Sequence, residues 1–409
     1  MIIVLANARI FDGVSDEIAE AKHVVIESGR IREVASRKPE FNDATVVDCR
    51  GKYVMPGLID AHFHAYSPSF DIPGIDRMPP ALLANHARII LEGALERGFT
   101  TVRDAAGGDI GLWLAIEQGL IRGPRFFFSG KALSQTGGHG DVRRGDQLEL
   151  CGCSGYTGAL SLVTDGPEGV RQAAREQLRH GAHQIKIFVS GGVLSPTDPM
   201  WMPQFTDAEI SAAVYEAATR RTYVMAHCHT DDGARRCVEC GVRSIEHGTL
   251  IRREDTAALI ASVGSYVVPT LSVIEVLHQH APTLRIPPES VEKIMGIGDE
   301  AFRAIETCSR AGVKLGLGTD LLDHRFHPLQ AGELELRGRV QKPIDVLRSA
   351  TSINAELIQK SGELGQITPN AYADLLVLNF DPLRGLASFG DPINIPVVMK
   401  NGVFIRNAL

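Results

Sequence analysis

Hydrophobic positions follow two different patterns along the chain. From residue 1 to about residue 56, short runs rich in β-branched residues are separated by the turn pairs Asp-Gly, Ser-Gly and Arg-Gly. The same pattern returns after residue 365 and ends in two runs around Asn401-Gly402, a pair typical of tight hairpins. Each terminal segment is too short for a core of its own, so we predict that residues 1–56 and 366–409 pair into one small β-sandwich domain.

The middle of the chain alternates short buried runs with amphipathic stretches, for example 208–221 and 301–312. Glycines precede several of the buried runs, as expected where a helix ends. No G-x-G-x-x-G motif opens a helix after a first strand, which argues against a doubly wound sheet. We therefore predict an α/β fold, a (β/α)8 TIM barrel over residues 57–365. Its expected strands are 58–65, 100–105, 125–130, 184–191, 222–229, 244–248, 266–271 and 314–320.

Composition narrows the class of protein without changing this fold. The 409 residues carry a formal charge of −7 and are 44% hydrophobic, which excludes a disordered chain and argues against a nucleic-acid binder. No run is long and apolar enough to span a membrane, and the apolar first ten residues lack the features of a signal peptide. We therefore expect a cytoplasmic protein that binds no membrane.

The seven cysteines are expected to be reduced thiols. Cys237-x-x-Cys240 and Cys151-x-Cys153 have spacings that a zinc or redox pair would also have. The first pair, however, lies in a stretch that reads as a helix face ending at Gly241, so a structural role is favoured.

Residues that bind metals gather at the ends of the predicted strands, where barrel enzymes carry their active sites. Because side chains alternate along a strand, His62 and His64 are expected to point the same way, into the barrel mouth. Imidazole and carboxylate ligands of this kind suit Zn²⁺ or a similar divalent ion. The full set comprises His62, His64, Lys186, His227, His247 and Asp320.

Each of these residues has an ordinary explanation when taken alone. A single strand histidine is usually a core residue, and Asp320 could cap a helix. Taken together, five strands place a residue of a metal-binding type at the same end, which favours a metal centre.

Lys186 adds a further expectation, since an ammonium beside bound cations is disfavoured. A neutral lysine can instead add CO₂ and become a carbamate that bridges two metals.

The order H-x-H, Lys, His, His, Asp resembles the amidohydrolase superfamily in its two-metal, carboxylated-lysine form. The stretches PGLIDAHFH, RGFTTVRDA, LSQTGGHGD, QIKIFVSGGVLSPTDP, VRSIEHG and GTDLL are similar to prolidase-like members, related to imidazolonepropionases and ochratoxin-hydrolysing enzymes. The resemblance covers essentially the whole chain. It implies two divalent ions, with Zn²⁺ as the expected metal. His62 and His64 would hold the more buried ion and His227 and His247 the other. Lys186, as N6-carboxylysine, would bridge both, and Asp320 would bind the first.

The implied activity is hydrolysis of the amide bond of a dipeptide or N-acyl amino acid, in the manner of an Xaa-Pro dipeptidase. A hydroxide bridging the metals would attack, and Asp320 would move its proton to the leaving amine. The alternative is another C–N or ester-like bond: an ochratoxin-type N-acyl aromatic amino acid, a cyclic imidazolone, a carbamate or a phosphotriester. A metal-free scaffold would have lost ligands and a single-metal deaminase would commonly lack Lys186, yet all six positions are present.

The small-molecule substrate is expected to contact the loops above the barrel. His139, in a glycine-rich loop, and His229, two residues beyond His227, are the candidate substrate-binding residues. His229 stands where the prolidase-like relatives often have tyrosine. Arg143, Arg144 and Arg325 are weaker candidates for binding a substrate carboxylate, and the proline-rich segment 67–80 is expected to be a wall or a lid. We also expect a homo-oligomer.

Overall fold

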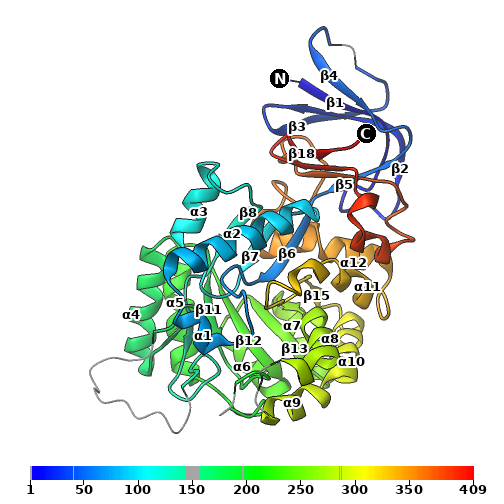
Figure 1. Ribbon diagram of the computed structural model, residues 1–409. Coiled ribbons are helices and arrows are strands. Elements are labelled where there is room, and N and C mark those ends of the chain that lie inside the picture. Colours follow the sequence, from blue (N-terminus) through cyan, green and yellow to red (C-terminus); the bar gives the residue numbers. More distant parts are fainter. Residues whose placement is uncertain (1, 40, 144–156, 196–197, 285, 287) are drawn as a thin grey trace.

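A barrel-like body carries a separate sheet at one end, and both chain termini lie in that sheet (Figure 1). The computed structural model describes residues 2–39, 41–143, 157–195, 198–284, 286 and 288–409. Within this part of the chain, no helix is long and apolar enough to cross a membrane.

The barrel strands lie close to where the hydrophobic pattern predicts them, and all are parallel. Three of them form one sheet: β6 (Leu58–Phe63), β7 (Phe99–Asp104) and β8 (Arg125–Phe128). A seven-stranded sheet has the order β10 (Ser161–Val163), β9 (Ala132–Ser134), β11 (Ile185–Phe188), β12 (Val224–Thr230), β13 (Ser244–Leu250), β14 (Tyr266–Val268) and β15 (Lys314–Leu315). The short strands β9 and β10 were not expected. Their three residues each leave almost no pattern to read.

The last predicted strand, 314–320, is wrong in extent, because regular pairing ends at Leu315. The following residues still run beside β6, since Ala61 N donates to Leu317 O and Asp320 N donates to His62 O, both at 2.8 Å. A Cβ atom at Gly318 would lie 2.6 Å from the Cβ of His62. Glycine at this position therefore lets the segment approach β6 closely and brings Asp320 to the first histidines.

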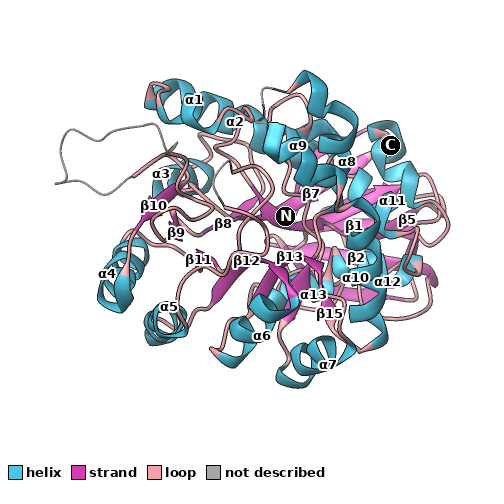
Figure 2. Cartoon of the chain, turned by 90° about the horizontal axis from the view of Figure 1, so that it is seen from below, coloured by secondary structure: helices cyan, strands magenta, loops and turns pink. Residues whose placement is uncertain are grey.

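Helices surround the barrel strands (Figure 2). The predicted helices 208–221 and 301–312 are confirmed as α5 and α10, each shifted by a few residues. Thr206 begins α5 with a capping box that includes Glu209. The helices are α1 (Ile72–Asp76), α2 (Pro80–Glu96), α3 (Ile110–Glu117), α4 (Gly166–Arg179), α5 (Asp207–Thr219), α6 (Asp231–Glu239), α7 (Glu254–Val263), α8 (Leu271–His280), α9 (Pro288–Met295), α10 (Gly298–Arg310), α11 (Gly332–Arg337), α12 (Pro343–Ser349) and α13 (Ser352–Leu357). Short 3-10 helices lie at Ala281–Thr283, His327–Leu329, Leu386–Gly390 and Pro392–Asn394.

Glycines end several of these helices as expected. Gly98, Gly181, Gly241, Gly264 and Gly312 all have φ between 73° and 94°, the left-handed region that glycine adopts without strain. Cys237 lies within α6 and Cys240 is the residue that caps its C-terminal end, so the predicted helix is confirmed at this place. The cysteines in the described residues are free thiols, and the Cys151–Cys153 pair lies outside that part of the chain.

The terminal segments form one mixed sheet, which confirms that the two ends of the chain pair. Its strands run β18 (Val403–Asn407), β17 (Val397–Lys400), β16 (Leu375–Leu378), β5 (Tyr53–Pro56), β1 (Ile2–Ile10), β2 (Ala19–Glu27) and β3 (Arg30–Ala35), with β4 (Ala44–Asp48) beside β1. β5 and β16 join the two ends in an antiparallel pair. One buried cluster includes Leu5, Val24, Val54, Val377 and Val397. The domain boundaries at residues 56 and 366 stay a prediction.

Candidate active site

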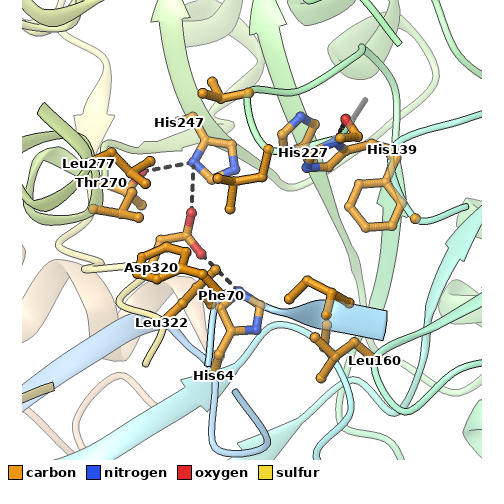
Figure 3. A pocket seen from close by; sticks show the side chains of 18 of the residues that line it. His64, Phe70, His139, Leu160, His227, His247, Thr270, Leu277, Asp320 and Leu322 are labelled. Carbon is orange, nitrogen blue, oxygen red and sulfur yellow. Dashed lines mark hydrogen bonds and ion pairs between the residues drawn. The ribbon is translucent and has the colours of Figure 1, made fainter. Parts of the chain in front are cut away.

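The eight candidate residues from the sequence line a single cavity of about 870 Å³ (Figure 3). They come from strands that are distant in sequence, and their placement matches the expected strand ends. The residues are His62, His64, His139, Lys186, His227, His229, His247 and Asp320.

Alternation along the strands explains how the side chains reach this cavity. On β6, Ala61 and Phe63 are buried in hydrophobic clusters, while His62 between them lines the cavity. His64 follows the end of the strand. We call His62, His64, Lys186, His227, His247 and Asp320 the strand-end group.

Asp320 lies at the centre of this group. Its carboxylate is 2.9 Å from His64 Nε2, 3.5 Å from His62 Nε2 and 3.8 Å from His247 Nδ1. One ligand atom from each of His62, His247 and Asp320 can lie within 4.8 Å of the others. The His247 ring is also 4.6 Å from that of His227. His247 therefore lies close both to His227, its implied partner ligand, and to Asp320.

Two members of the group have unusual backbone conformations. His247 has φ of 70° and Asp320 has φ of 52°, in a region that non-glycine residues seldom occupy. Strained residues of this kind cluster at functional sites. At His247 this conformation interrupts the strand alternation, and the consecutive residues Glu246 and His247 contact His62 and Asp320, respectively.

Two charged residues behind the strand-end group were not singled out from the sequence. Glu246 Oε2 lies 2.7 Å from His62 Nδ1, so the carboxylate accepts the Nδ1–H and leaves Nε2 facing Asp320. Arg103 donates to both Glu246 oxygens at 2.9 and 3.0 Å, and both side chains are fully buried. Opposite charges in two buried strands, within RGFTTVRDA and IEHG, were the signal that could have found this pair.

Hydroxyl groups orient two further rings. Thr270 Oγ1 lies 2.8 Å from His247 Nδ1, and Thr249 Oγ1 lies 3.0 Å from His229 Nδ1. The ring of His229 also stacks on that of His247 at 5.1 Å. The candidate substrate residue His229 is therefore held within the same imidazole cluster as the candidate ligands.

His139 is held by a loop. Its ring stacks on His227 at 4.3 Å. Its Nδ1 is 2.7 Å from Ser195 Oγ and 3.3 Å from Asp198 Oδ2. We call His139 and the segment 191–199, apart from residues 196 and 197, the His139 loop.

Burial keeps four imidazoles of this site neutral, those of His62, His227, His229 and His247. It lowers the pKa of His62 to about 4 and that of His229 to about 3, and it lowers those of His227 and His247 well below the usual value. Burial alone would raise the pKa of Asp320, but the neighbouring His62 and the hydrogen bond from His64 lower it to about 2. His62, His227 and His247 thus offer neutral imidazoles and Asp320 an ionised carboxylate, the forms that bind metals.

Lys186 is the member of the group whose charged form is disfavoured by burial. Its side chain is buried, and burial lowers its pKa to about 8. Among the described residues, its Nζ makes no hydrogen bond or ion pair. Carboxylation would replace this buried cation by an anion with two oxygen ligands. The donor set therefore fits the two divalent ions that the resemblance implies.

The remainder of the cavity is mostly apolar. Segment 67–80 contributes Phe70, Ile72 and Pro73 and so forms a wall, while α8 contributes Val273, Ile274 and Leu277. Other apolar lining residues are Val142, Leu160, Phe188, Val193, Leu194, Ile286, Ile297 and Leu322.

The candidate arginines lie elsewhere. Arg143 and Arg325 are bound to Asp141 and Asp323, at 2.6 and 2.7 Å, and neither lines the cavity. Arg144 lies outside the described residues.

Comparison with known proteins identifies the family. The amidohydrolase family model matches residues 53–405. Ochratoxinase from Aspergillus niger is 34% identical over 373 residues, which cover 86% of this chain and 75% of the relative. A solved prolidase in complex with N-methylphosphonate-L-proline is 44% identical, with a TM-score of 0.95 and all of both chains covered. A solved Xaa-Pro dipeptidase is 28% identical, with a TM-score of 0.88 and the same coverage. The TIM-barrel-like fold, the strand-end group and these matches agree, and the chain belongs to the amidohydrolase family.

Proposed function

We propose that this amidohydrolase cleaves the amide bond that joins an acyl group to an amino acid, in an Xaa-Pro dipeptide or an N-acyl amino acid. The observation that carries the proposal is the convergence of the strand-end group, His139 and His229 on one cavity. Support comes from the 44% identical prolidase, which was solved with a phosphonate derivative of proline.

Two divalent ions are proposed as cofactors, with Zn²⁺ as the expected metal. His62, His64 and Asp320 would hold one ion and His227 and His247 the other, with carboxylated Lys186 between them. When bound, the ions would make hydroxide available near neutral pH and polarise the scissile carbonyl.

The chain's own residues supply the proton transfers. Asp320 is ionised and partly exposed to the cavity, so it can accept a proton from the attacking water. A C–O bond forms as the water oxygen attacks. Asp320 then delivers the proton to the amine nitrogen as the C–N bond breaks. His139 and His229 border the same space and would bind the substrate carbonyl or carboxylate.

A second candidate substrate class is an N-acyl aromatic amino acid. The cavity's volume of about 870 Å³ and its apolar walls favour a bulky apolar acyl group over the small side chain of a simple dipeptide. The relationship to ochratoxinase supports the same class.

Cytoplasmic location and a homo-oligomeric state stay predictions of the sequence.

The test combines metal analysis with a substrate panel. We expect about two ions per chain and hydrolysis within a panel of Xaa-Pro dipeptides, N-acyl prolines and N-acyl phenylalanines. Products are identified by mass spectrometry, so that the broken bond is known. Two ions without cleavage of any amide would contradict the substrate proposal. Absence of metal from active protein would contradict the proposed cofactors.

A further inference from the structure

One lysine outside the proposed machinery binds the His139 loop from behind. Lys293 lies on α9 and is half-buried. Its Nζ donates hydrogen bonds of 2.9 Å to three backbone carbonyls, those of Gly192, Ser195 and Asp198. The same helix makes a second contact with this loop, because Ser290 Oγ donates to Leu194 O at 3.1 Å.

The carbonyls bound by Lys293 belong to the residues that fix His139. Ser195 Oγ and Asp198 Oδ2 approach Nδ1 of the imidazole. Asp198 is fully buried, and its Oδ2 also accepts from Gly192 N at 3.0 Å and from Gln204 Nε2 at 3.1 Å. The backbone carbonyls of this loop thus bind the ammonium of Lys293, while two of its side chains contact the ring of His139.

The fit of this loop around the ring is close. A Cβ atom at Gly192 would lie 2.0 Å from Cε1 of His139, so the imidazole packs directly on the glycine backbone. The ring also stacks on that of His227. A small shift of the loop would therefore move His139 relative to the strand-end group.

We propose that Lys293 is a positioning residue: by binding three carbonyls of the His139 loop, it sets the place of the His139 imidazole in the active site. The inference rests on the proposed function only in giving His139 a substrate to contact. Lys293 itself does not line the cavity. Its effect passes through Ser195, Asp198 and Gly192 to the ring.

The first experiment measures the loop directly by hydrogen–deuterium exchange. It compares wild type, Lys293→Met, Lys293→Arg and, as control, Glu292→Gln on the exposed side of the same helix. In Lys293→Met we expect faster amide exchange in peptides covering residues 135–141 and 190–205. Glu292→Gln should match wild type, and Lys293→Arg should lie between the two. Unchanged exchange in a folded Lys293→Met protein would overturn the proposal. Because this readout needs no substrate, it holds even if the proposed function fails.

The second experiment is a double-mutant cycle with His139→Asn on the best amide substrate. We expect Lys293→Met to lower kcat/KM about 10- to 100-fold in the wild-type background, because a misplacement near 1 Å has effects of this size. In the His139→Asn background it should cause little further loss, since its effect acts through the ring. An equal loss in both backgrounds would overturn the positioning role.

A milder variant keeps the test decisive if Lys293→Met does not fold. Ser290→Ala removes only the bond to Leu194 O. We expect the same exchange pattern as in Lys293→Met, at smaller amplitude. Exchange changes spread over the whole barrel, or none in the His139 loop, would contradict the proposal.

Discussion

The strand-end group and the His139 loop border the same cavity but are held in place by different means. The strands of the first are fixed by parallel backbone ladders, such as Lys186 opposite Met225 and His227 opposite Glu246. The second depends on hydrogen bonds between the backbone and single side chains: Lys293 donates, while Asp198 and Gln204 accept. His62, Lys186, His227 and His247 thus lie on strands, while His64 and Asp320 follow strand ends. The residue expected to meet variable substrates lies on a loop that one side chain can release.

The largest expected effect breaks the strand-end group at its centre. Asp320→Asn keeps the shape of the side chain but removes its capacity to accept a proton. We expect kcat to fall by about 10³-fold or more with metal content unchanged. Steady-state kinetics and metal analysis on the same sample check this, with exposed Asp345→Asn as control. Wild-type turnover at full metal occupancy would rule out the assigned role.

The next largest effect concerns the buried ion pair of Arg103 and Glu246, which lies behind the strand-end group. Arg103→Met leaves the fully buried carboxylate of Glu246 without its ion pair. Breaking a buried pair from one side costs about 3–5 kcal/mol, so the free energy of unfolding should fall by that amount. Urea denaturation of the metal-free protein measures it. A loss below about 1 kcal/mol, the range of surface pairs, would show that the pair does not support the site.

A pH effect of similar or smaller size follows from Lys186. Its pKa is about 8 in the folded chain and 10.5 when unperturbed, so between these values the unfolded state binds more protons. Stability of the metal-free protein should therefore rise with pH across this window, by roughly 3 kcal/mol in total.

Urea denaturation at several pH values in CO₂-depleted buffer tests this gain in stability. Lys186→Met is the reference and should lack the rise. Parallel pH curves for the two proteins would mean that the lysine is not buried as a cation in the metal-free state.

The smallest effect belongs to the His139 loop. Gly192→Ala places a methyl group against the His139 ring and should displace it. We expect kcat/KM to fall about tenfold while metal content stays at the wild-type level. Gly119→Ala tests the assay for unspecific glycine effects, although its φ of 72° will itself cost some stability. Loss of metal from the Gly192→Ala enzyme would contradict the proposal that the strand-end group is held in place independently of the His139 loop.

The sequence was informative where a residue's place depends on local pattern. Short buried runs between amphipathic stretches located the barrel strands, and the position of a residue at a strand end predicted that His62, Lys186, His227 and His247 would line one cavity. The glycines before the strands have the left-handed conformation that was expected of them. Pairing of the two chain ends followed from the shortness of each terminal segment.

What could not be predicted depends on contacts between distant segments. The pair Arg103–Glu246 lies in two predicted strands, but no periodicity says which buried charges meet. Lys293 lies in a helix some 100 residues beyond the loop it binds, so its role has no local signature. The last predicted strand is too long, because glycines at 316 and 318 keep the chain beside β6 without a regular ladder.

The mixed sheet built from both chain ends also bears on how the protein is made. Pro56 of β5 pairs with Leu375 of β16, more than 300 residues later. During synthesis, β1 to β5 leave the ribosome before the barrel, and the strands that complete their sheet follow it. Most barrel strands pair with neighbours in sequence and can assemble in the interval, whereas the residues after β15 have to return to β6. Until β16 is made, the edge of β5 that it covers is unpaired, and an unpaired edge can pair with another chain.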